Sequence, residues 1–313
     1  MRFLVLCLLF AAGCAYADTW QPSPGHTQLT LWPGIVPDAQ PLPGLEYMKT
    51  EEKERVAGKP YLYLGNISEP TLTVYSPTGK NTGAAVLVIP GGGFQILAID
   101  LEGTEVCDWL TSNGITCVLL KYRVPSAPYD WHCDCRPQNL MVPAQSLEDV
   151  QRAMGLTRLH ATDWHIDPRK LGVLGFSAGG YLVAEISTHF DRRLYQLVDA
   201  ADKESCRPDF AVAIYPGHIE SAGKLNPNVP VSERTPPTFL LQAEDDHVDG
   251  VEESLVYFAA LKKAGVPVEM HLYTQGGHAF GLRPTALPIT HWPSLLLPWF
   301  RTIGMIPNGA ADP

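Results

Sequence analysis

The stretch LGVLGFSAGGYLVAEIS at residues 171–187 constrains the fold of this chain more than any other. A short apolar run leads into the pattern Gly-x-Ser-x-Gly around Ser177, and a segment with helical spacing follows at once. Glycines two positions before and after a serine let a strand reverse sharply into a helix, which lifts the hydroxyl above the sheet at a helix N-terminus. A chance match in an ordinary loop is the alternative, but the flanking strand and helix favour a nucleophile. We therefore predict that Ser177 is a nucleophile.

Short apolar runs alternate with segments of helical spacing from residue 84 onward, which is typical of a parallel sheet covered by helices on both faces. The expected strands are residues 84–90, 115–122, 171–176, 210–216, 238–243 and 268–273. The expected helices are residues 104–112, 144–160, 178–188, 251–264 and 290–303. We predict an α/β fold, a three-layer α/β/α sandwich around a mostly parallel, doubly wound sheet.

The N-terminal part of the chain has a different pattern. Residues 27–33 and 71–77 have strand character and are expected to pair antiparallel at one edge, joined by a connection rich in proline and glycine. Two irregular segments, 124–143 and 217–237, follow strands at the edge where such sheets bind ligands, so we expect them to wall a substrate pocket. No repeat or change of composition divides the chain, and we predict a single catalytic domain over residues 18–313.

The first 17 residues have the pattern of a signal peptide. Arg2 precedes an apolar run, and the triplet Ala-Tyr-Ala that ends at Ala17 supplies small residues before a cleavage site. The apolar run is too short to cross a bilayer as a permanent helix. We expect a secreted or periplasmic protein cleaved before Asp18; the alternative is a lipoprotein anchored through Cys14.

Charge and cysteine content narrow the possible partners. The formal net charge of −10 argues against binding to nucleic acid or another polyanion. An exported chain can form disulfides, but five cysteines beyond the leader cannot all pair with one another. Their pairing stays open: Cys107, Cys117, Cys133, Cys135 and Cys206. The segment WHCDC at residues 131–135 lacks a second Cys/His group at zinc spacing, which favours a disulfide or buried thiols over a metal.

A glycine-rich loop follows the first buried strand. The sequence VLVIPGGGFQIL at residues 86–97 holds three successive glycines, where no side chain keeps the backbone amides from a ligand. A phosphate-binding loop would need Gly-Lys-Ser/Thr, and a dinucleotide-binding loop would need a later glycine; both are missing. We predict that the amides of Gly92 and Gly93, with that of Ala178, form an oxyanion hole beside Ser177.

A general base for Ser177 is expected late in the chain. In LYTQGGHAFGL, residues 272–282, His278 stands between glycines on a loop after the last strand. His271 is the rival, but it falls inside the strand pattern, where its side chain is committed to one face. The loop favours His278, because a base must adjust its reach to the nucleophile.

The stretch QAEDDHVDG at residues 242–250 is crowded with titratable side chains. An EF-hand would need a bidentate glutamate where Val256 stands, and zinc would need further neutral ligands nearby, so a metal site is disfavoured. The stretch follows the strand before the last one, which is where the acid lies in the chain order serine, acid, histidine. We predict that one of its carboxylates orients His278.

Together these motifs resemble the α/β-hydrolase superfamily, and within it the secreted esterases related to acetyl xylan esterases, dienelactone hydrolases and prolyl oligopeptidases. The matching segments include PGGGFQILAIDLEG, the Gly-x-Ser-x-Gly turn, QAEDDHVDG and GGHAFG. In that group an apolar residue follows the acid after one position, and Asp246-His247-Val248 fits this frame. The resemblance implies that Asp246 is the triad acid, with Asp245 and Asp249 as alternatives. His247 and Asp249 depart from the family, where proline and an apolar residue are common.

The resemblance further implies a serine carboxylic-ester hydrolase that removes acetyl or other short acyl groups from plant polysaccharide such as xylan. Its partner would be an ester substrate, and no metal or organic cofactor would be needed. Phe94 and Trp131 are candidates for substrate contact, with core packing as the alternative for each. The insert at residues 129–137 has no counterpart in the family. Alternative functions are a feruloyl esterase, a general carboxylesterase, a small-peptide serine peptidase and a non-catalytic carbohydrate-binding module.

Overall fold

The computed structural model describes residues 19–42, 44–125 and 144–308. Its centre is an eight-stranded sheet in the order β1-β4-β7-β5-β8-β9-β12-β13. The strands from β7 to β13 in this order run parallel, and β4 pairs antiparallel with both β7 and β1. The strands are Thr27–Thr30 (β1), Thr71–Tyr75 (β4), Ala85–Ile89 (β5), Thr116–Lys121 (β7), Leu171–Phe176 (β8), Ala211–Ile214 (β9), Thr238–Ala243 (β12) and Val268–Tyr273 (β13).

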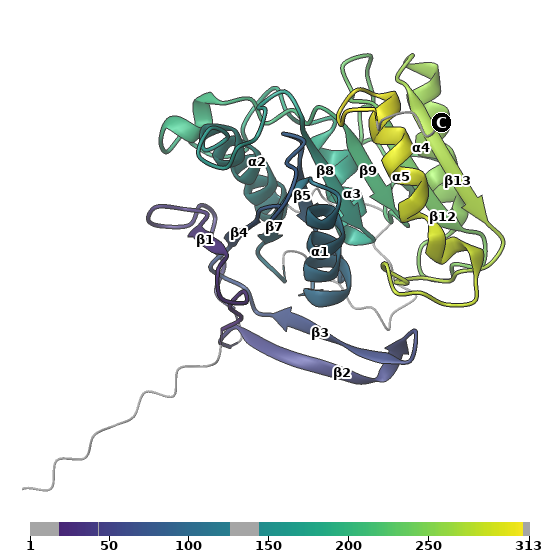
Figure 1. Ribbon diagram of the computed structural model, residues 1–313, viewed down its shortest axis with the longest axis horizontal. Coiled ribbons are helices and arrows are strands. Elements are labelled where there is room, and N and C mark those ends of the chain that lie inside the picture. The colour runs from purple at the N-terminus through teal and green to yellow at the C-terminus, as the bar shows by residue number, and fades with distance from the viewer. Residues whose placement is uncertain (1–18, 43, 126–143, 309–313) are drawn as a thin grey trace, which may run out of the picture.

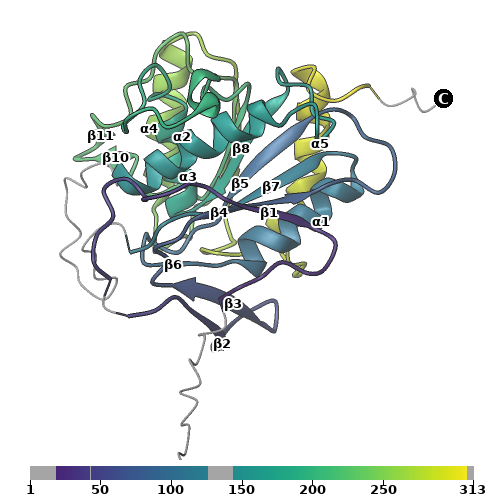
Figure 2. The ribbon, with the colours of Figure 1, turned by 90° about the vertical axis from the view of Figure 1, so that its left-hand side faces the viewer.

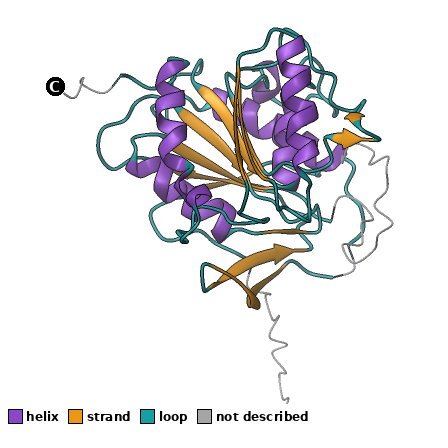
Figure 3. Ribbon diagram, turned by 90° about the vertical axis from the view of Figure 1, so that its right-hand side faces the viewer, coloured by secondary structure: helices purple, strands orange, loops and turns teal. Residues whose placement is uncertain are grey.

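Helices cover both faces of the sheet (Figure 2), with α1 and α5 on one face and α2, α3 and α4 on the other. The α-helices are Glu105–Ser112 (α1), Ala144–Leu159 (α2), Ala178–Ile186 (α3), Val251–Lys263 (α4) and Pro293–Thr302 (α5). A π-helical turn, Asp100–Thr104 (η1), precedes α1, and the 3-10 turns are Ala200–Lys203 (η2) and Pro288–His291 (η3). Figure 3 shows the strands between the two helical layers, so the predicted α/β/α sandwich is confirmed.

The central strands are buried along their whole length, which accounts for their apolar composition. Every residue of β5, β7, β8, β9 and β12 is buried. Because helices cover both faces, side chains that point either way meet the core, and no alternation with polar residues remains. The six strands predicted from residue 84 onward agree with the structure within two residues at each end.

The connection between β1 and β4, predicted only as a stretch rich in proline and glycine, has regular structure of its own. It contains a hairpin of β2 (Tyr47–Val56) and β3 (Lys59–Gly65), which turns at Ala57 and Gly58 with positive φ angles. The hairpin pairs with the short strand β6 (Ile96–Leu97), directly after the glycine loop. Figure 1 shows the hairpin outside the main sheet, below it in this view. The alternation in KPYLYLG was the sequence indication for β3, and the neighbouring prolines and glycines obscured it.

Two smaller features complete the description. Cys107 of α1 and Cys117 of β7 form a disulfide, and Cys206 is a buried thiol. The segment 217–237 carries a short hairpin of Glu220–Ser221 (β10) and Lys224–Leu225 (β11). Within the described ranges, the structure contains no helix of the length and apolarity that a membrane span requires. The leader, Cys14, Cys133, Cys135 and the insert at 129–137 lie outside the described residues.

Candidate active site

Ser177 stands at the sharp turn between β8 and α3. Its backbone has φ 51° and ψ −120°, a strained conformation for a residue with a side chain. The two flanking glycines permit the turn. A Cβ on Gly179 would lie 2.1 Å from the carbonyl oxygen of Ile89, and one on Gly175 would lie 2.2 Å from that of Gly179. The predicted strand–serine–helix turn is therefore present, with Ser177 only 4% exposed.

Three residues predicted from the sequence meet at this turn. Ser177 Oγ lies 2.9 Å from His278 Nε2, and His278 Nδ1 lies 2.7 Å from Asp246 Oδ2. When Nδ1 donates to the carboxylate, Nε2 is left as the acceptor for the serine proton. The rival His271 lies on β13, with its Nε2 2.8 Å from Glu269 Oε1. The arrangement is that of a hydroxyl activated by an oriented base.

Hydrogen bonds from its own loop fix the orientation of the Asp246 carboxylate. Oδ1 accepts from the amides of Val248 at 2.9 Å and Asp249 at 3.0 Å, and Oδ2 accepts from Gln242 Nε2 at 3.2 Å. Gln242 is itself held by the Ser254 hydroxyl, which donates to its Oε1 at 2.9 Å. Asp246 is 4% exposed, so its charge depends on these donors and on the imidazole.

Asp245 has a different contact from its neighbour. Its Oδ1 accepts from the amides of Gly276 and Gly277, at 2.8 and 2.7 Å. These two glycines immediately precede His278. Asp245 therefore holds the backbone of the histidine loop, while the next residue along the chain contacts the histidine ring.

The pKa of His278 is raised above its ordinary value. Burial by itself lowers the pKa of an imidazole, but three carboxylates outweigh it: Asp246 through its hydrogen bond and charge, and Asp249 and Glu102 through their charges. A stronger base takes the serine proton more readily, although it also remains protonated up to a higher pH.

The glycine loop lies against the nucleophile turn. A Cβ on Gly91 would come within 2.9 Å of the Ser177 Cβ. Among the described residues, no acceptor meets the amides of Gly92 and Gly93. Ala178 is the first residue of α3, so its amide has no helical partner. The glycine loop thus lies beside the serine, and the amides of Gly92, Gly93 and Ala178 remain the predicted donors of an oxyanion hole.

Phe94, which follows these glycines, is buried. It has a φ of 62° and is 1% exposed. Its ring meets Tyr181 of α3 edge-on at 6.2 Å between centroids and lies 6.0 Å from the ring of His218. Phe94 therefore packs into the wall beside the glycine loop. The other candidate for substrate contact, Trp131, lies outside the described residues.

The chain resembles known esterases along most of its length. The BD-FAE family profile matches residues 72–216, and the prolyl oligopeptidase family profile matches residues 218–302. A solved structure, the acetyl ester-xyloside bifunctional hydrolase from Caldicellulosiruptor lactoaceticus, is 32% identical. The match covers 90% of this chain and 97% of that one, with a TM-score of 0.68. The chain belongs to the α/β-hydrolase esterases of the BD-FAE family.

The family that the motifs predicted is therefore confirmed. Two further relatives are similar to this BD-FAE esterase. An acetylxylan esterase of Xylanibacter ruminicola is 27% identical over 263 residues, which are 76% of this chain and 49% of the relative. The chain therefore spans about half the length of that curated relative. MGS-M1, an α/β-hydrolase enzyme from a Medee basin deep-sea metagenome library, is 25% identical over 75% of this chain and 92% of that chain, with a TM-score of 0.58.

In this BD-FAE esterase a buried glutamate links the glycine loop to the histidine loop. Glu102, on η1, is 2% exposed; its Oε2 accepts from the Gly91 amide at 2.7 Å and its Oε1 from the Tyr215 hydroxyl at 2.8 Å. The Tyr215 hydroxyl accepts from the Gly281 amide at 3.3 Å, and its ring lies 4.9 Å from that of His278. The pKa of Glu102 is raised, because burial outweighs the hydrogen bonds from Tyr215 and Gly91 and the His278 charge, all of which lower it.

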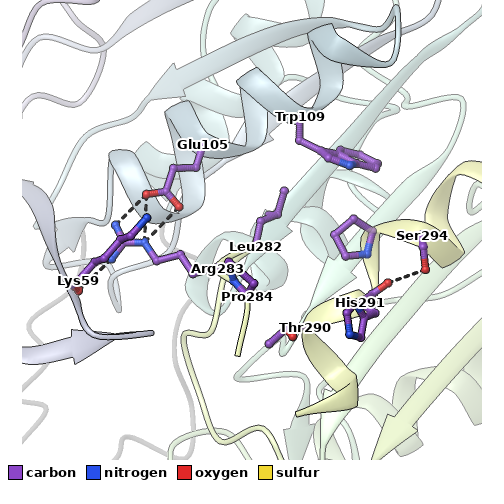
Figure 4. A pocket seen from close by; sticks show the side chains of 10 residues that line it. Lys59, Glu105, Trp109, Leu282, Arg283, Pro284, Thr290, His291 and Ser294 are labelled. Carbon is purple, nitrogen blue, oxygen red and sulfur yellow. Dashed lines mark hydrogen bonds and ion pairs between the residues drawn. The ribbon is translucent and has the colours of Figure 1, made fainter. Parts of the chain in front are cut away.

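Arg283 anchors the far end of the histidine loop (Figure 4). Its guanidinium donates to Glu105 at 2.8 to 3.1 Å and to the backbone oxygens of Lys59 and Pro60 at 3.0 and 2.9 Å. These contacts hold the loop against α1 and the hairpin of β2 and β3.

A pocket of about 460 Å³ lies beside Arg283 and its partners. Trp109 lines this pocket, and no triad residue does.

The sequence did not point to Glu102 or Tyr215. Each acts through contacts with segments far away along the chain, and the acidic residues in the apolar run ILAIDLEG were the sole local indication. A metal site was disfavoured from the sequence. Within residues 19–42, 44–125 and 144–308, no three His, Cys, Asp or Glu side chains gather as metal ligands would.

Proposed function

We propose that this chain is a serine carboxylic-ester hydrolase that releases acetyl groups from plant polysaccharide such as xylan. The observation that carries the proposal is the relay from Asp246 through His278 to Ser177, with contacts of 2.7 and 2.9 Å, beside three amides. Two relatives support the choice of acetyl as the acyl group and of a xylan-type polysaccharide as the substrate. One is named acetylxylan esterase, and the other acetyl ester-xyloside bifunctional hydrolase.

Acylation begins when Ser177 Oγ bonds to the ester carbonyl carbon and its proton passes to His278 Nε2. The carbonyl electron pair moves onto oxygen, where the amides of Gly92, Gly93 and Ala178 stabilise it. Each such donor contributes about 3 kcal/mol to lowering the barrier. The pair then returns, the bond to the alcohol oxygen breaks, and that oxygen takes the proton from Nε2.

Deacylation repeats these steps with water. His278 takes a proton from a water molecule while the water oxygen bonds to the acyl carbon. The oxyanion again forms beside the same three amides. Collapse breaks the bond to Ser177 Oγ, which recovers its proton from Nε2 and releases acetate. Through both halves Asp246 holds the imidazole in one tautomer and stabilises its cation.

The packing beside the glycine loop is evidence that the substrate carries a short acyl group. The acyl carbon must lie between Ser177 and the oxyanion amides, and Phe94 directly follows those amides. We infer that its buried ring, packed against Tyr181 and His218, limits the room for a longer acyl chain. This favours acetyl over larger groups.

We also infer that the mature protein works outside the cytoplasm. The leader pattern carries this inference, and the disulfide between Cys107 and Cys117 supports it, because such bonds persist in oxidising compartments. Mass spectrometry of the exported protein should find a chain that begins at Asp18. A lipid-modified Cys14 would instead establish a lipoprotein.

Acetate release from acetylated xylan tests the function directly. Wild-type protein should release acetate and should hydrolyse p-nitrophenyl acetate faster than the butyrate or methyl ferulate, and Ser177→Ala should lose both activities. Absence of ester turnover in the wild type, or turnover unchanged by Ser177→Ala, would overturn the mechanism. A preference for methyl ferulate would be consistent with the proposed mechanism but would overturn the proposed acetyl substrate.

A further inference from the structure

Asp249 presents a buried carboxylate beside the reacting nitrogen. Its Oδ2 lies 3.8 Å from His278 Nε2, and the residue is 4% exposed. The backbone of Asp249 is occupied, since its amide donates to Asp246 and its carbonyl accepts from Gln242. In the described part of the chain, no side chain or amide donates a hydrogen bond to its carboxylate.

The position of this carboxylate is sterically defined. It lies over the backbone of Gly217, where a Cβ would come within 2.4 to 2.5 Å of its atoms. At 3.8 Å the approach to Nε2 is too long for a hydrogen bond, and Nε2 already faces Ser177 at 2.9 Å. Ionised carboxylate oxygens are strong hydrogen-bond acceptors, so a ligand that reaches this nearly enclosed group can supply the donor that the described residues do not.

The mechanism indicates which part of the substrate reaches Asp249. His278 Nε2 returns its proton to the leaving alcohol oxygen, which must come within about 3 Å of that nitrogen. A carboxylate beside the same nitrogen therefore faces the alcohol part of the ester. The acyl part points toward the glycine loop and Phe94.

We propose that Asp249 binds a hydroxyl group of the alcohol, on the carbon next to the one that bears the ester. The proposal rests on the proposed esterase function and adds to it the feature that the site recognises, a free hydroxyl beside the ester in partly acylated sugars and other polyols. A vicinal hydroxyl is a neutral donor close to the ester oxygen, so one molecule can meet Nε2 and Asp249 together. Charge-assisted hydrogen bonds of this kind are among the stronger ones.

A pair of esters that differ in one hydroxyl tests the proposal. We expect wild-type protein to cleave trans-2-hydroxycyclohexyl acetate with a kcat/KM about 10- to 100-fold above that for cyclohexyl acetate. Asp249→Ala should abolish this ratio, and its rate with cyclohexyl acetate measures separately what the lost charge does to His278. Asp249→Asn, which keeps an acceptor oxygen without the charge, should retain part of it. The ratio cancels any effect of the lost charge on His278, because the same base cleaves both esters.

Each other outcome counts against the proposal. Equal kcat/KM of the two esters with wild type overturns it without any variant, as does a ratio that persists in Asp249→Ala. Faster cleavage of acetylcholine than of the hydroxy ester would show a site for cations instead. The proposed function fails separately, through p-nitrophenyl acetate turnover that is absent or insensitive to Ser177→Ala. If thermal unfolding shows that Asp249→Ala does not fold, Asp249→Asn and the wild-type ratio decide.

Discussion

His278 Nδ1 and Asp246 Oδ2 lie 2.7 Å apart, although a second aspartate directly precedes Asp246 in the chain. Both aspartates lie in the turn after β12, in which the Asp246 amide donates to the Ala243 carbonyl at 3.4 Å, and the turn gives their side chains different partners. Asp245 accordingly meets the amides of Gly276 and Gly277, and Asp246 meets the imidazole. One carboxylate orients the ring, and its neighbour holds the loop that carries the ring.

Asp246→Asn should lower kcat for p-nitrophenyl acetate by about 10³- to 10⁴-fold. The amide can donate to Nδ1 and so favours the tautomer whose Nε2 cannot accept the serine proton. Steady-state kinetics measure the loss, and thermal unfolding should show a folded protein.

Asp245→Asn is the matched control and should keep most of the activity. Both glycine amides donate to the same oxygen of Asp245, and the asparagine carbonyl can still accept them. Asp245→Ala removes that acceptor and should lower kcat further while the histidine loop loosens. If Asp245→Asn were the more damaging of the two asparagine variants, Asp245 would be the triad acid.

The pH dependence of kcat/KM should reveal the raised pKa of His278. Only the neutral imidazole accepts a proton, so activity should fall as pH falls, with a midpoint above the ordinary histidine pKa of about 6.5. The groups that face the ring are the carboxylates of Asp246, Asp249 and Glu102 and the aromatic ring of Tyr215. Glu102→Gln removes one negative charge, and the midpoint should move to lower pH.

Glu102→Gln should also lower kcat by about 10- to 100-fold, because Glu102 positions both the glycine loop and, through Tyr215, the histidine loop. Tyr215→Phe should lower it too, and the double variant should be little worse than either single one. Glu185→Gln alters another buried glutamate, at the far end of α3, and should change neither kcat nor the midpoint. If the midpoint of the pH profile did not shift in Glu102→Gln, the Glu102 charge would have no effect on His278 and the residue would have a structural role only.

Phe94→Ala should broaden the acyl preference. Removal of the ring opens volume beside the glycine loop, and the ratio of p-nitrophenyl butyrate to acetate turnover should rise about tenfold. Because Phe94 is buried, the variant should also lose about 3 to 5 kcal/mol of unfolding free energy. Tyr181→Phe, which keeps the neighbouring ring, should leave the ratio as it is. A constant ratio in Phe94→Ala would mean that Phe94 serves packing only.

Loss of the disulfide should lower stability without touching the chemistry. The bond joins Cys107 and Cys117, ten positions apart, and replacement of both by serine should cost about 2 to 3 kcal/mol. Chemical denaturation with and without a reductant measures this difference. Hydrolysis of p-nitrophenyl acetate by the folded double variant should match wild type. A large loss of kcat would show that the disulfide helps to position the active site.

The hairpin of β2 and β3 shows where prediction from the sequence stopped. Its strands are partly exposed and flanked by prolines and glycines, so periodicity was weak there, whereas the buried strands from residue 84 onward were unmistakable. Glu102 and Tyr215 were missed for another reason. They are 113 positions apart, and the local sequence around neither residue shows that the two meet.

Local patterns in the sequence were enough to predict the layered fold, the nucleophile turn at Ser177 and the chain order of serine, acid and histidine. These depend on local physics, namely apolar continuity in strands buried on both faces and the space that glycines leave at a sharp turn. The folded chain was needed to reveal which contacts the neighbouring aspartates make, that Glu102 joins two loops, and that Asp249 lies beside His278 Nε2. Those are distances between segments that the chain brings together only when the sheet has formed, and no local pattern encodes them.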